Sequence, residues 1–120
     1  MQKLMTKQFS KWTSKQEISK SELANAMIEF QNGIFDANLG GCIYKKRIRF
    51  KGQGKRGSGR TILCYKKDDK AIYIHGFSKN EKSNLTKKEL NVFKELANIL
   101  LKLSPENISI AINNGDLIEV

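Results

Sequence analysis

The sequence lacks any apolar run approaching the roughly 18 residues that a membrane-spanning helix requires. Its first residues, MQKLMTKQFSKW, are interrupted by three lysines and contain no small-residue cleavage site, so they do not resemble a secretory signal. We therefore expect a cytoplasmic protein with no membrane partner.

Residues that bind metals or form disulfides are scarce. The two cysteines, Cys42 and Cys64, are far apart in the sequence, and His75 is the only histidine. No CxxC or Cys/His cluster is present, and neither is a phosphate-binding loop of the GxxxxGK[ST] type. We expect two reduced, packed thiols and no bound metal or cofactor. Any catalysis would then use cations, a tyrosine or the histidine.

Acidic residues are also few. The chain has 12 Asp and Glu against 22 Lys and Arg, which gives a net charge of +10 and favours a polyanionic partner, nucleic acid before a membrane surface. With 120 residues, of which 39% are hydrophobic, the chain is expected to form one domain over 1–120 that folds without disulfides.

Three helices are indicated by a capping serine or threonine followed by apolar residues at helical spacing. The capping residues are Ser19, Thr86 and Ser104. The first helix should span about 20–32 and end at Gly33, and the third should end near Gly115. Residues 3–9 are compatible with a strand or with the start of a helix.

Strand-like runs occupy 42–50, 60–67 and 70–78. The segment before them, 33–41, reads as a turn region, and the segment 51–59 reads as a basic loop because it holds four glycines and three cations. The order of helix, antiparallel strands and helices predicts an α+β fold, a small antiparallel sheet with helices packed on one face.

The segment 42–60 contains eight cations and no acid. Strand alternation places Lys45, Arg47 and Arg49 on one face, opposite most of the apolar residues of that strand. A lysine-rich edge strand in water is the alternative. It does not explain the missing acids, whereas a surface that binds phosphates does.

The run 70–78 adds aromatic candidates. Simple alternation puts Tyr73, His75 and Phe77 on one face, where they would stack on the bases of single-stranded RNA. The alternative is that these residues pack in the core of a sheet covered on both sides. For Phe77, core packing and base stacking are equally favoured. A lone histidine is more often structural than catalytic.

The segments DANLGGCIYKKRIRFKGQGKRGSGRTILCY and AIYIHGFSKNEKSNLTKKEL together resemble the HigB-like branch of the RelE/ParE toxin superfamily. The shared pattern combines LGG, a basic strand, the glycine-rich sequence GxGKxGxxR, the sequence GFxKNE and a following helix. The resemblance covers about 18–103 and extends more loosely over 104–120.

This resemblance implies a toxin of a type II toxin–antitoxin system, inhibited by an antitoxin of the helix-turn-helix kind. It implies metal-independent cleavage of messenger RNA on the ribosome, in which the 2′-hydroxyl of the RNA attacks the adjacent phosphate. Such a reaction needs a base, an acid and cations that stabilise the phosphate charge.

The resemblance also implies site residues. Arg60 takes the place of the family's phosphate-contacting arginine, and Lys79 would supply a charge that Asn80, in the place of an arginine, does not. Both Arg60 and Lys79 are expected to face solvent. The catalytic set is predicted to be Arg60, Lys79, His75, Tyr73 and Lys55. The RNA-binding set is predicted to be Lys45, Arg47, Arg49, Lys51, Arg56, Phe77 and Asn80. Tyr65, Tyr73 and His75 are all candidates for the proton transfer.

Two other functions are compatible with the pattern. One is a ParE-like toxin that binds DNA gyrase without cleaving RNA. The other is a non-enzymatic domain that binds RNA or the ribosome. The basic face and Arg60 favour the ribonuclease, because a gyrase-binding toxin would not require them.

Overall fold

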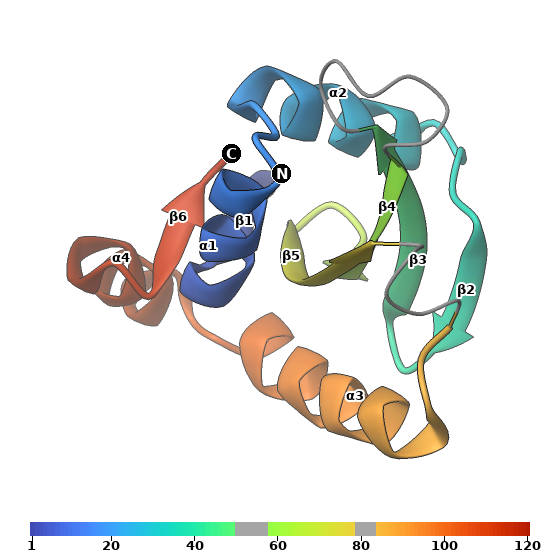
Figure 1. Ribbon diagram of the computed structural model, residues 1–120. Coiled ribbons are helices and arrows are strands. Elements are labelled where there is room, and N and C mark those ends of the chain that lie inside the picture. The colour runs from blue at the N-terminus through green and yellow to red at the C-terminus, as the bar shows by residue number, and fades with distance from the viewer. Residues whose placement is uncertain (50–57, 79–83) are drawn as a thin grey trace.

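A mixed β-sheet lies at the centre of the computed structural model, which describes residues 1–49, 58–78 and 84–120 (Figure 1). Along the chain the elements are β1 (Gln2–Thr6), α1 (Lys7–Lys15), α2 (Lys20–Gln31), β2 (Ala37–Gly40), β3 (Ile43–Arg49), β4 (Ser58–Lys66), β5 (Lys70–Ser78), α3 (Lys87–Leu101), α4 (Pro105–Asn114) and β6 (Leu117–Glu119). The predicted α+β class is confirmed.

The strand order in the sheet is β2-β3-β4-β5-β1-β6. Neighbouring strands from β2 to β5 are antiparallel, but β1 is parallel to β5, with Leu4 opposite Ile72. On its other side β1 pairs with β6, so the first and last strands lie side by side (Figure 1). The expectation of a purely antiparallel sheet is therefore wrong, because the first strand inserts between two strands made much later.

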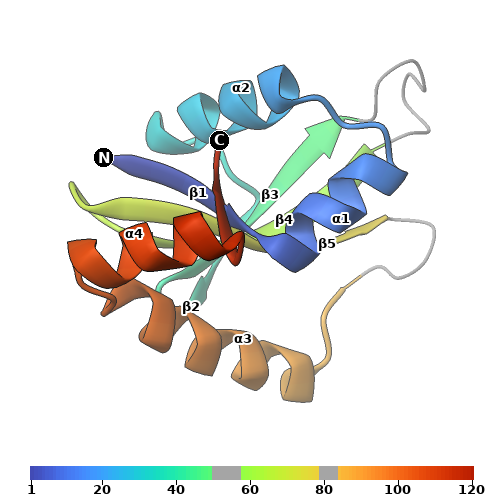
Figure 2. The same cartoon turned by 90° about the vertical axis from the view of Figure 1, so that its left-hand side faces the viewer.

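Helices cover both faces of the sheet, not one as the sequence analysis predicts. Figure 2 shows α2 on one side of the sheet and α3 with α4 on the other. Two separate core clusters correspond to these layers. Leu63 and Tyr73 pack with residues of α1 and α2, whereas Ile62 and Ile72 pack with residues of α3 and α4. Adjacent residues of β4 and β5 thus enter opposite cores, which is why these strands are apolar at successive positions.

The predicted helix starts are confirmed by their capping bonds. The N–H of Thr86 donates to the Glu89 carboxylate at 2.9 Å, and the N–H of Glu89 donates to the Thr86 hydroxyl at 3.1 Å. Ser19 and Ser104 each cap their helix through the side-chain oxygen. The predicted glycine after the first of these helices, Gly33, has φ of 88°, which is left-handed backbone.

The N-terminal segment contains both of the structures that its sequence allows. Residues 2–6 form β1, and the helix α1 starts directly afterwards, where the Thr6 hydroxyl accepts a hydrogen bond from the N–H of Phe9 at 3.1 Å. The rings of Phe9 and Trp12 lie 5.6 Å apart, so these two aromatics share the inner side of the helix as expected.

The edge strand β2 lies within 33–41, which the sequence analysis reads as a turn. Its pairing with β3 shifts register between Asn38 and Gly40, and Gly40 has φ of 81°. The Asn38 side chain accepts a hydrogen bond from the N–H of Gly40 at 3.0 Å across this irregularity. A strand of four residues that is interrupted in this way is too short for its alternation to predict a strand.

Both cysteines are free. Cys64 is packed, but Cys42 is exposed at a position with φ of 65°, so the expectation of packing is wrong for Cys42. In the part of the chain that the structure describes, no helix has the length and apolarity to cross a membrane.

Candidate nucleic-acid interface

Arginines from two neighbouring strands meet on one face of the sheet. Arg47 of β3 lies directly opposite Arg60 of β4, and Lys45 lies opposite Ile62. Alternation places Arg49 on this same face. Arg47 and Arg49 are exposed and Lys45 is half-buried. We call these four residues, Lys45, Arg47, Arg49 and Arg60, the cation face. It belongs to the side of the sheet that α3 covers.

Arg60 does not face solvent as predicted. Its side chain is only 13% exposed, because it lies opposite Phe77 of β5 and forms an ion pair with Asp36, in which Nε and Oδ2 are 2.8 Å apart. One terminal nitrogen, Nη1, also donates to the Gly59 carbonyl at 3.4 Å. The ion pair with Asp36 therefore restrains the guanidinium at its Nε.

Asp36 is a residue of this site that the sequence analysis missed. It is the only acid between Glu29 and Asp68, directly before the acid-free basic segment. That isolated negative charge was the one available signal. Its position beside Arg60 depends on the pairing of β2, β3 and β4, which local patterns do not indicate.

A β-bulge overturns the predicted aromatic face of β5. Leu63 is opposite Tyr73 and Ile62 is opposite His75, so Ile74 is the additional residue. This extra residue reverses the alternation, and Tyr73 therefore faces α1 and α2, whereas His75 faces α3.

Tyr73 is a core residue with no exposed surface. Its ring stacks on Phe9 with centroids 4.8 Å apart, and its hydroxyl donates to the Leu23 carbonyl at 2.8 Å. Burial, and to a smaller extent the charge of Glu29, raises the pKa of Tyr73 well above its ordinary value. The prediction that Tyr73 faces RNA is wrong.

Phe77 and His75 are on the face that carries the cations, but they differ in exposure. Phe77 is 3% exposed and belongs to the core beneath α3, so its predicted stacking on an RNA base is wrong. His75 is half-buried, with its ring 4.7 Å from Phe93 of α3 and 6.1 Å from Phe77. Of the three predicted aromatics, His75 alone is both partly exposed and on the correct face.

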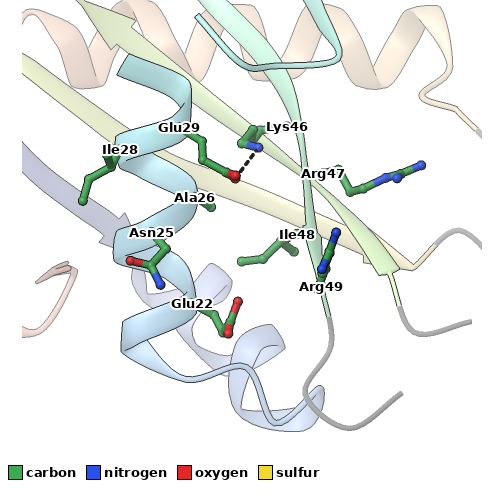
Figure 3. A pocket seen from close by; sticks show the side chains of 9 residues that line it. All are labelled: Glu22, Asn25, Ala26, Ile28, Glu29, Lys46, Arg47, Ile48 and Arg49. Carbon is green, nitrogen blue, oxygen red and sulfur yellow. Dashed lines mark hydrogen bonds and ion pairs between the residues drawn. The ribbon is translucent and has the colours of Figure 1, made fainter. Parts of the chain in front are cut away.

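The other face of β3 is chemically different. A cavity of about 590 Å³ lies between α2 and β3, and its lining combines Glu22 and Glu29 of α2 with Lys46 and the edges of Arg47 and Arg49 of β3 (Figure 3). Lys46, which is buried, donates to Glu29 at 2.9 Å. Figure 3 shows Arg47 pointing away from α2. Because Lys46 is already paired with Glu29 and the two carboxylates would repel a phosphate, the cation face is the better candidate for an anionic ligand.

Several predicted residues lie outside the described residues. These are Lys51, Lys55, Arg56, Lys79 and Asn80. Within 1–49, 58–78 and 84–120, no group of three or more His, Cys, Asp or Glu side chains is arranged to hold a metal ion.

A comparison with known protein families identifies the family of the chain. The sequence model described as the RelE toxin of the RelE/RelB toxin–antitoxin system matches residues 1–120. The chain therefore belongs to the RelE toxin family, and it is a toxin of a toxin–antitoxin system with an antitoxin as its partner. RelE toxins are generally ribonucleases that inhibit translation. A comparison with curated proteins gave no match.

Proposed function

We propose that this protein is a ribosome-dependent endoribonuclease of the HigB-like branch that cleaves messenger RNA during translation without a bound metal. The observation that supports this most is the pairing of Arg47 with Arg60, with Arg49 exposed on the same face. Cα atoms of directly opposite residues are about 5 Å apart, so two positive side chains at such positions repel each other. A phosphodiester beside them would offset the repulsion that Asp36 leaves uncompensated, and the planar guanidinium suits its oxygens.

The proposed reaction uses the RNA's own nucleophile. The 2′-oxygen forms a bond to the adjacent phosphorus, and the bond from phosphorus to the 5′-oxygen breaks. The products are a 2′,3′-cyclic phosphate and a 5′-hydroxyl. Arg47 and Arg60 would stabilise the charge that develops on the non-bridging oxygens. One proton leaves the 2′-hydroxyl and one reaches the departing 5′-oxygen.

We assign a proton-transfer role to His75. Tyr73 is buried on the other side of the sheet. Tyr65 also packs on that side, with its ring 5.1 Å from that of Phe30. His75 is the remaining candidate among the three, and imidazole is the side chain that most often transfers protons in enzymes.

The family resemblance extends the proposal to residues outside the described part. Lys55 and Lys79 would contact the phosphate, and Lys51, Arg56 and Asn80 would contact RNA. Within the described part, Lys45 and Arg49 would contact messenger or ribosomal RNA. We further propose that the chain acts as one domain in the cytoplasm and that its antitoxin is a helix-turn-helix protein.

The test is induction of the protein in growing cells, followed by mapping of messenger RNA 5′ ends. We expect cuts inside translated codons that disappear when translation is blocked. Growth arrest with intact messenger RNA would refute the proposal and favour the gyrase-binding function. Binding to ribosomes without cuts or arrest would also refute it, in favour of a non-enzymatic domain.

A matched pair of variants tests the cation face. Arg47→Ala should reduce cleavage by about a hundredfold, since removal of one preorganised donor to a transition-state oxyanion has that effect. Lys66→Ala removes the same charge from the far end of β4, where the side chain is 62% exposed, and should leave cleavage unchanged. Equal loss in both variants would show that net charge matters and the cation face does not.

A further inference from the structure

An acid on a surface that binds phosphate requires an explanation, because it lowers the affinity for an anion. Asp36 is such an acid, since its carboxylate lies 2.8 Å from Nε of Arg60. It is also well anchored. Its backbone N–H donates to the Lys45 carbonyl at 2.7 Å, and the next residue, Ala37, is paired with Lys45 in the sheet.

The carboxylate reaches Arg60 across an intervening strand. Asp36 directly precedes β2, and β3 lies between β2 and β4. The cluster thus joins the residue before β2 to two neighbouring strands, in which Arg47 of β3 is opposite Arg60 of β4. The Asp36 charge lies beside Arg60, the residue opposite Arg47, and therefore reduces the repulsion between the two arginines.

The geometry of the contact leaves the arginine able to bind. A guanidinium has five N–H donors, of which Nε carries one and the two terminal nitrogens carry four. Among the described residues, the terminal nitrogens make one hydrogen bond, from Nη1 to the Gly59 carbonyl at 3.4 Å, which is long for such a bond. The end of the guanidinium that is used for bidentate phosphate binding is not the part that Asp36 contacts.

We infer that Asp36 is a positioning residue that holds Arg60 through Nε and so directs its terminal nitrogens to the scissile phosphate. The inference rests on the proposed ribonuclease function and deepens it. An unrestrained arginine has many rotamers, and fixing them before the substrate arrives removes part of the entropic cost of reaching the transition state. Because Asp36 acts through Arg60, it touches no reacting atom.

The structure offers a closely matched control. Glu29 forms a 2.9 Å ion pair with Lys46 on the other face of the sheet, and its side chain is 54% exposed. Glu29→Gln and Asp36→Asn each remove one carboxylate charge from an ion pair with a cation of β3 or β4. Both therefore change the net charge equally, which separates positioning of Arg60 from a general gain in affinity for RNA.

The experiment measures cleavage on ribosomes programmed with a defined messenger RNA, using purified full-length protein. We expect Asp36→Asn to lower kcat about tenfold and Asp36→Ala to lower it further, with KM changed less than threefold. The order follows because asparagine keeps a polar oxygen beside Nε, whereas alanine removes both the charge and the oxygen. Glu29→Gln should retain the wild-type kcat. Melting curves confirm that each variant is folded, and if Asp36→Ala is unfolded, Asp36→Asn decides the test.

A second readout does not depend on activity. The NMR signal of the Arg60 Nε–H, assigned by its loss in Arg60→Lys, should be sharp in the wild-type protein and in Glu29→Gln. It should be broadened in Asp36→Ala. A signal that is equally sharp in all of these proteins would show that Asp36 does not order Arg60, and would overturn the inference.

The other outcomes are also decisive. Wild-type kcat in both Asp36 variants would overturn the inference and leave the ribonuclease function standing. Faster cleavage in these variants would overturn it too, because Asp36 would then compete with the phosphate for Arg60. If the wild-type protein cleaves no messenger RNA on ribosomes, the proposed function itself fails, and the NMR signal then reports only on a structural ion pair.

Discussion

Replacing Tyr73 by phenylalanine separates the two roles that its hydroxyl can have, a structural hydrogen bond and proton transfer. The hydroxyl donates to the Leu23 carbonyl at 2.8 Å, in a position with no exposed surface. The ring stacks on Phe9 with an interplanar angle of 5°. The substitution keeps the ring and its stacking, and it removes one oxygen atom.

We expect Tyr73→Phe to lower the free energy of unfolding by about 1 kcal/mol, the net contribution of a hydrogen bond between neutral groups. The cost is limited because Leu23 lies within α2, where its carbonyl keeps the helical hydrogen bond. For a domain of this size, the melting temperature should fall by about 3–6 °C. Urea denaturation gives the free energy, and cleavage of messenger RNA on ribosomes should stay within twofold of the wild-type rate.

The reverse result would refute this reasoning. If Tyr73→Phe melted like the wild-type protein and cleaved RNA a hundredfold more slowly, the hydroxyl would be chemically active and the buried placement would be wrong. His75→Gln is the matching variant, because His75 is half-buried and faces α3. We expect it to lose cleavage by a factor of about a hundred, within the range for general acid–base catalysis.

Three further predictions concern stability. Lys70 is buried and donates to the carbonyls of residues 101 and 103 at 3.3 and 3.1 Å. Lys70→Met should therefore lower the free energy of unfolding by about 3 kcal/mol in urea denaturation. Lys66→Met, which removes an exposed cation beside the same partner, Asp69, should lower it by less than about 0.5 kcal/mol. A Cβ at Gly76 would overlap the Trp12 ring, so Gly76→Ala should lower the melting temperature strongly. Trp12→Leu in the same chain should restore part of the loss, and additive effects of the two substitutions would contradict this contact. Burial raises the pKa of the Cys64 thiol from 9.0 to about 12. Its stabilising contribution is therefore complete below pH 9 and is lost as the pH rises towards 12, by about 1.4 kcal/mol per pH unit at most, and Cys64→Val should flatten this part of the stability curve.

The features that the sequence predicts correctly are local. A capping threonine and the glutamate three residues later interact within one helical turn, so Thr86 and Glu89 mark the start of α3 without any knowledge of the fold. Apolar runs likewise indicate the three central strands, with ends that differ by at most two residues from those of β3, β4 and β5.

The features that the sequence does not predict depend on distant partners. The bulge at Ile74 exists only relative to β4, and it decides that Tyr73 and His75 face opposite layers. The parallel pairing of β1 with β5 and the contact of Asp36 with Arg60 are also non-local. Predicting the orientation of the candidate side chains therefore requires the sheet register. Recognising the family and the basic strand does not.

The position of β1 has a consequence for the time course of folding. This strand is synthesised first, but Leu4 pairs with Ile72 and Met5 pairs with Ile118. At about 5–20 residues per second, the partner in β6 appears on the order of ten seconds after β1. Contacts between such distant residues also carry a high loop-closure entropy, which slows folding. We therefore expect the sheet to be completed only after β6 has left the ribosome that makes it, so that β1 stays without one of its two neighbours during most of the synthesis of this domain.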